Sequence, residues 1–205
     1  MAQQILLEID SLKMLRHRRR WNLYFLVATG DPEDTSKMAI TTLSGFDANN
    51  PITLRPPAHN EIHFAPENQA GASGLIAMQR AMPADYSVQC RLWLMQTRSE
   101  IVEVGHILKS ISTYLEGSEV IQDVEKLMGV ANQWVFAGKA INKGIGGVSE
   151  AISKLKDRNL GFINMDEHFG PEILKTGEID LHNTLSSGYA ELSWTWSVFS
   201  PPTQA

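Results

Sequence analysis

The 205-residue sequence contains a single cysteine, Cys90. One cysteine excludes an internal disulfide framework and a cysteine-based zinc site, and it favours a reducing compartment. Basic residues are also few: the sequence has 18 of them against 23 acidic residues, and the formal net charge is -5. A general nucleic-acid-binding surface is therefore not expected, and any cationic site must be local.

Long apolar runs are absent too. No segment approaches the roughly 18 uninterrupted apolar residues of a spanning helix, and the N-terminal MAQQILLEID lacks the charged region and apolar core of a signal peptide. We expect a cytoplasmic chain that does not span a membrane and that either stays in solution or associates peripherally with a membrane. Export without a signal peptide stays compatible with these features.

The familiar catalytic motifs are missing as well: there is no GxSxG, P-loop, HExxH or dinucleotide-type glycine pattern. The best catalytic candidate is MDEHFG at 165–170, because Asp166 and His168 share strand parity and could converge as acid and base. A surface turn is the commoner origin of such a group. The sequence therefore predicts no catalytic residue, metal or cofactor, and a hydrolase using Asp166 and His168 is kept as an alternative.

What the sequence does contain is strand periodicity. Apolar residues alternate with polar ones over residues 4–9, and Trp21, Leu23, Phe25 and Val27 share one face of the stretch WNLYFLVA. Similar patterns predict further strands at about 52–55, 61–65 and 86–96, and a final pair around 179–181 and 192–198. Residues 65–85 stay unassigned.

Between about 100 and 158 the apolar spacing changes to three and four, which predicts helices. A first helix ends near Gly117, a second starts after Ser118, and Gly144, Gly146 and Gly147 predict a break before SEAISKLKDR. The expected organisation is a mainly-β antiparallel sandwich formed by residues 1–99 and 159–200. A two- to three-helix insertion at 100–158 interrupts it, and residues 201–205 form a tail.

The order of these segments resembles the C2-like β-sandwich family over residues 4–98 and 157–199. The stretches that carry the resemblance are LEIDSLKML, WNLYFLVA, NEIHF, CRLWLMQ and DRNLGFINM. The resemblance implies a scaffold that docks on phospholipid or protein through loops at one end, often with calcium held by aspartates of the first and third loops.

This chain departs from that pattern, because its first loop carries RHRRR and the segment before the insertion reads QTRSE. Calcium needs six to eight oxygen ligands, several of them carboxylates. We therefore expect no calcium site of the family's kind.

The basic loop is the clearest candidate binding site. Such a cluster can attract anionic headgroups, and arginine can clamp a phosphate or carboxylate through two hydrogen bonds. Alternatively, the arginines pair with this chain's own acids, including Glu100 and Glu103. The predicted binding residues are Lys13, Arg16, Arg18, Arg19 and Arg20.

Two further contact residues are predicted. Trp93 has the opposite strand parity to Leu92 and Leu94, so we expect it to be exposed, and Arg98 lies beside the insertion. Together these features favour a non-catalytic, calcium-independent module that docks on an acidic membrane surface or a protein partner. A structural subunit of a larger assembly, including a homo-oligomer, is the alternative from another class.

Overall fold

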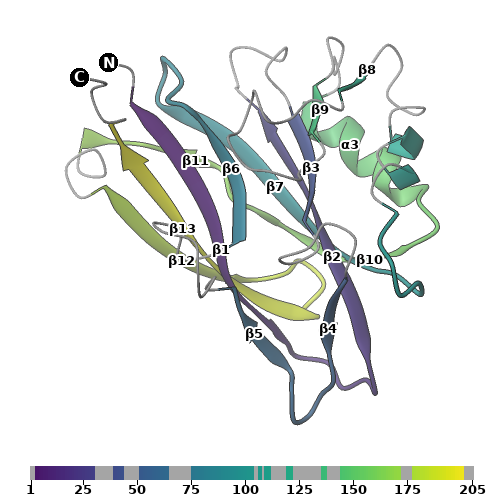
Figure 1. Cartoon of the computed structure of the whole chain (residues 1–205). Coiled ribbons are helices and arrows are strands. Elements are labelled where there is room, and N and C mark those ends of the chain that lie inside the picture. Colours follow the sequence, from purple (N-terminus) through teal and green to yellow (C-terminus); the bar gives the residue numbers. More distant parts are fainter. Residues whose placement is uncertain are drawn as a thin grey trace, which may run out of the picture.

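The computed structural model describes residues 3–30, 39–43, 51–64, 75–103, 106–107, 109–111, 119–121, 135–137, 144–171 and 177–200. These residues form two antiparallel sheets that face each other (Figure 1), which confirms the predicted mainly-β, sandwich-like architecture.

The first sheet is centred on β1 (Gln4–Met14). One edge of β1 pairs with β13 (Ala190–Phe199), which in turn pairs with β12 (Glu178–Thr184). The other edge is shared by β6 (Leu75–Ala81) and β5 (Glu61–His63). The predicted strands at 4–9, 61–65, 179–181 and 192–198 are thus confirmed, and β6 lies in the stretch that the sequence left unassigned.

The second sheet is centred on β2 (Trp21–Gly30) and β7 (Ser87–Gln96). On the side away from β7, β2 pairs with β3 (Ala39–Leu43) and β4 (Ile52–Leu54). On the side away from β2, β7 pairs with β10 (Arg158–Asn164) and β11 (Glu167–His168). Beyond β3 the sheet continues through β9 (Val135–Ala137) to β8 (Glu119–Ile121).

The main core fills the space between the sheets. The pairing of β1 with β13 shifts between Ile9 and Ser11, so Asp10 forms a bulge. Because a bulge reverses strand parity, Ile9 and Leu12 both point inward although they stand three residues apart. The largest side chains of this core are Trp21, Phe25, Phe64, Phe169, Trp194 and Trp196.

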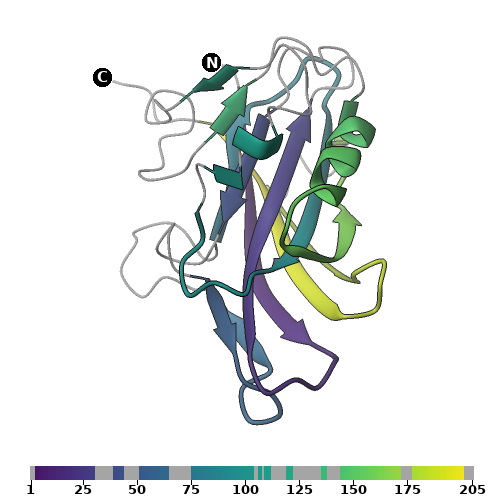
Figure 2. The same ribbon diagram turned by 90° about the vertical axis from the view of Figure 1, so that its right-hand side faces the viewer.

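A second core covers the outer side of the β2–β7 sheet. α3 (Gly144–Ser153) packs there through Val148, Ala151 and Ile152, beside the helical residues 106–107 and 109–111 (Figure 1 and Figure 2). Trp93 has the outward parity that the sequence predicts but is only 1% exposed. The prediction that Trp93 is exposed is therefore wrong, because helical segments distant in sequence cover that face.

The helical insertion is not confirmed in the form predicted. Residues 119–121 and 135–137, expected in the second helix, are strands that extend the sheet beyond β3. Both are rich in β-branched or aromatic residues, so an available sheet edge outweighs their helical spacing. The break predicted at Gly144, Gly146 and Gly147 is also wrong, because α3 begins at Gly144 and runs through all three. The remainder of the second helix lies outside the described residues.

In the described part of the chain, no helix has the length and apolar character needed to cross a membrane.

Candidate anion-binding cleft

The predicted basic loop joins the two sheets. Residues 15–20 connect β1 to β2 at the end of the sandwich opposite the start of β1 and the end of β13 (Figure 1). All six residues are exposed. The loop is anchored by its first residue, because the Leu15 amide donates to the Tyr189 carbonyl over 2.9 Å. The sequence prediction that two strands flank an exposed basic loop is confirmed.

Two arginines of this loop stack on aromatic rings. The Arg18 guanidinium carbon lies 4.9 Å from the centre of the Trp21 ring, and Arg18 Nη1 donates to Gln96 Oε1 over 2.9 Å. The Arg16 guanidinium carbon lies 5.5 Å from the centre of the Tyr189 ring. A cation–π contact of this kind holds a guanidinium near the ring and leaves N–H groups available to a ligand.

Tyr189 also holds an arginine from another element. The guanidinium carbon of Arg158 lies 5.3 Å from the Tyr189 ring centre, and Arg158 Nη2 donates to the tyrosine Oη over 2.7 Å. Arg158 opens β10, so Tyr189 brings the start of that strand close to the basic loop.

These residues border a cleft of about 590 Å³ between the loop, the end of β7 and the turn before β10. Among the described residues, its lining contains four basic side chains and one carboxylate: Arg18, Arg98, Lys156, Arg158 and Asp157. The polar remainder is Gln96, Thr97 and Ser99. A chain with a net charge of -5 thus concentrates positive charge in one cleft.

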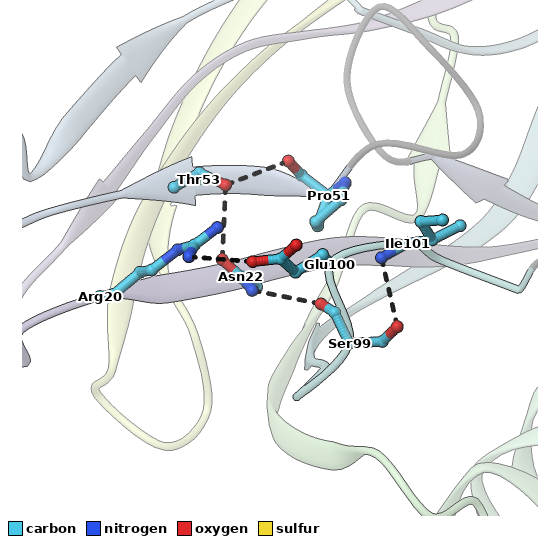
Figure 3. Close-up of polar contacts among 7 residues, drawn as sticks. All are labelled: Arg20, Asn22, Pro51, Thr53, Ser99, Glu100 and Ile101. Atoms are coloured by element: carbon cyan, nitrogen blue, oxygen red, sulfur yellow. Dashed lines mark hydrogen bonds and ion pairs between the residues drawn. The ribbon is translucent and has the colours of Figure 1, made fainter.

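The wall that carries Arg98 is built by consecutive hydrogen bonds (Figure 3). Asn22 of β2 is 9% exposed and donates from Nδ2 to the Ser99 carbonyl over 3.2 Å. Its Oδ1 accepts from Thr53 Oγ1 over 3.4 Å. Hydroxyl oxygens tighten the turn further. Ser99 N donates to Thr97 Oγ1, and Ile101 N donates to Ser99 Oγ (Figure 3). Residues 97–101 are therefore held over the outer face of β2.

The opposite wall is held by Tyr24, two residues further along the same face of β2. Tyr24 is fully buried, and its hydroxyl donates to Asp157 Oδ2 over 2.9 Å. Burial, followed by the nearby Asp157 carboxylate, raises the pKa of Tyr24 well above its ordinary value, so the hydroxyl stays a donor. This bond fixes the turn that presents Lys156 and Arg158 and occupies one oxygen of the cleft's carboxylate.

The other predicted binding residues lie around the cleft without lining it. Arg20 Nη1 lies 3.7 Å from Glu100 Oε1 (Figure 3), and Lys13 Nζ lies 3.5 Å from Glu191 Oε2. The expectation that Glu100 would pair with a loop arginine thus describes Arg20. No described residue forms a hydrogen bond or ion pair with the Arg19 side chain.

The sequence reasoning missed Lys156, Arg158 and Tyr189. The first two belong to KLKDR, where cations alternate at Lys154, Lys156 and Arg158. A spacing of two is typical of a strand, but the apolar spacing predicts helix up to about residue 158. The structure ends α3 at Ser153, so this part of the prediction is wrong.

Asp166 and His168 engage different groups. Asp166 Oδ1 accepts from the Cys90 amide over 2.8 Å, and His168 Nδ1 lies 2.9 Å from Ser87 Oγ. Cys90 is fully buried, and burial raises the pKa of its thiol well above the ordinary value. Asp166 and His168 thus each bond to a residue of β7.

Comparison with known proteins finds no family model and no curated protein that matches this chain.

Proposed function

We propose that this protein is a non-catalytic, calcium-independent binding module with a C2-like sandwich, and that it docks an acidic segment of a protein partner into the basic cleft. One observation carries the proposal: Arg18, Arg98, Lys156 and Arg158 line a single cleft in which Asp157, the one carboxylate among the described lining residues, already accepts a hydrogen bond from Tyr24. The C2-like assignment is supported by the sequence resemblance and by the architecture of two antiparallel sheets that is compatible with it.

The cations of the cleft divide into held and unpaired ones. Arg18 is held by a cation–π contact with Trp21 and a hydrogen bond to Gln96, and Arg158 by both kinds of contact with Tyr189. The side chains of Arg98 and Lys156 are exposed and bond to no described residue. Held arginines lower the ordering cost of binding, and unpaired cations supply charge that the fold itself does not neutralise.

The cleft suits a protein segment better than a flat membrane surface, because the basic side chains lie between two walls that a segment can enter. Peripheral membrane binding is the second candidate, and a different observation supports it: Leu15, in the same basic loop, is 40% exposed. An exposed leucine among arginines is suited to a headgroup layer.

The test compares charge reversal inside the cleft with reversal outside it. Arg98→Glu/Lys156→Glu alters exposed side chains that bond to no described residue, so the fold should stay intact. Binding of a fluorescein-labelled oligoglutamate peptide at low salt should weaken at least about tenfold, and high salt should weaken wild-type binding similarly. Arg19→Glu/Arg55→Glu is the matched control, because it changes the net charge by the same amount at two exposed residues that do not line the cleft.

Sedimentation with phosphatidylserine vesicles, with and without calcium, separates the two candidates. Leu15→Ser/Arg19→Glu should abolish vesicle binding if the loop meets a membrane and should leave peptide binding unchanged if the cleft takes a protein. Equal peptide binding by wild type and by Arg98→Glu/Lys156→Glu would refute the cleft as the binding site.

A further inference from the structure

A second cleft adjoins the basic one. It has a volume of about 570 Å³ and shares Thr97, Ser99, Lys156 and Asp157 with the first as common lining. It continues along the helical residues 106–107 and 110 and the residues that directly follow α3. A ligand that fills the basic cleft can therefore extend across the shared wall.

The chemistry of the second cleft differs from that of the first. Its lining includes Ile101, Ile107 and Leu155, beside Glu103, His106, Ser110 and Lys154. Ile101 is 56% exposed, and the hydrogen bond from its amide to Ser99 Oγ holds its backbone at the shared wall. An isoleucine held in this way offers apolar surface that the fold leaves uncovered.

We propose that the ligand is an extended peptide segment in which acidic side chains stand next to a large aliphatic one. The acidic side chains occupy the basic cleft, and the aliphatic side chain packs against Ile101, Ile107 and Leu155. This inference rests on the proposed function, and it adds an apolar requirement to the charge requirement.

The lining favours a peptide over an acyl chain. An acyl chain needs continuous apolar walls, whereas carboxylate, imidazole, hydroxyl and ammonium groups alternate here with the three aliphatic side chains. An extended peptide has backbone N–H and C=O groups that such polar side chains can satisfy, and pockets for individual side chains supply specificity.

The experiment uses labelled peptides with one acidic block in common. One set carries leucines beside the glutamates, in both block orders, and the matched set carries serines in place of the leucines. Wild type should bind the better leucine peptide about tenfold more tightly than its serine counterpart. Ile101→Ser should reduce that advantage to about twofold or less, whereas Leu15→Ser, which removes an exposed leucine outside the cleft, should preserve it.

The outcomes separate this inference from the proposed function. If leucine and serine peptides bind equally, and both are lost in Arg98→Glu/Lys156→Glu, the apolar requirement is wrong and acidic-segment binding stands. If neither peptide binds while phosphatidylserine vesicles do, both proposals are wrong. An undiminished leucine advantage in Ile101→Ser also overturns the inference.

Discussion

Replacing Tyr24 with phenylalanine tests how the cleft is built. The substitution removes one oxygen, the donor to Asp157 Oδ2 over 2.9 Å, and leaves the buried ring in place. Hydrogen bonds to charged groups contribute about 1.5–3 kcal/mol to stability. Because Asp157 is only partly buried, water can reach its freed oxygen, so we expect a loss of about 1.5 kcal/mol.

The assay is equilibrium urea denaturation of a double-mutant cycle that combines Tyr24→Phe with Asp157→Ala. If the hydrogen bond exists, the losses of the single variants should not add, and the coupling energy should be about 1 kcal/mol or more. Tyr86→Phe is the matched control: Tyr86 is 43% exposed, so its stability should change by less than about 0.5 kcal/mol.

Binding supplies a second readout. Without the Tyr24 bond, the turn that carries Lys156 and Arg158 loses its anchor, so Tyr24→Phe should also weaken oligoglutamate binding although Tyr24 does not line the cleft. Additive stability losses together with unchanged peptide affinity would refute the idea that Tyr24 positions this wall.

Three further predictions concern the scaffold. Burial raises the pKa of the Asp10 carboxyl above its ordinary value of 3.8. The protonated carboxyl therefore contributes its full stability below pH 3.8, and this contribution is lost as the pH rises through the folded-state pKa. Urea denaturation should find Asp10→Asn more stable than wild type at neutral pH and equally stable below pH 3.8. Cys90 is fully buried, so a thiol reagent should modify it only on unfolding, and modification in native buffer at the rate of a free thiol would contradict its placement. Gly161→Ala should lower stability in thermal unfolding by about 1–3 kcal/mol, because Gly161 has φ +124° and an added Cβ would lie 2.6 Å from Ser187 Oγ. Gly170→Ala is the control, because a Cβ added there would meet no atom within 4 Å.

The face of a strand that turns toward the main core could be predicted from the sequence. Trp21, Leu23, Phe25 and Val27 face the main core as their alternation indicates. The outer face could not be predicted in the same way: parity places Trp93 outside the sandwich, but only the fold brings α3 over it. Strand periodicity identifies the side on which a residue lies, and tertiary packing decides whether that side is covered.

The candidate site was predictable only in part. The basic loop is contiguous in sequence, so its charge is visible, whereas the cleft depends on contacts such as that of Arg18 with Gln96, separated by 78 positions. Arg158 and Tyr189 meet across 31 positions. No local pattern encodes such pairs, because each depends on how β7, β10 and β13 are placed around the first loop.

One strand sets the rigidity of the cleft. The inner side chains of β2 lie in the main core, while Asn22 and Tyr24 on its outer face bond to the two walls at Ser99 and Asp157. If either wall moved away, a buried polar group would lose its partner at a cost of about 1–3 kcal/mol. The walls should therefore be preformed in the free protein, and adjustment to a ligand should fall to the exposed side chains of Arg98 and Lys156. Wall movement on binding, seen as faster amide exchange at residues 97–101, would contradict that division.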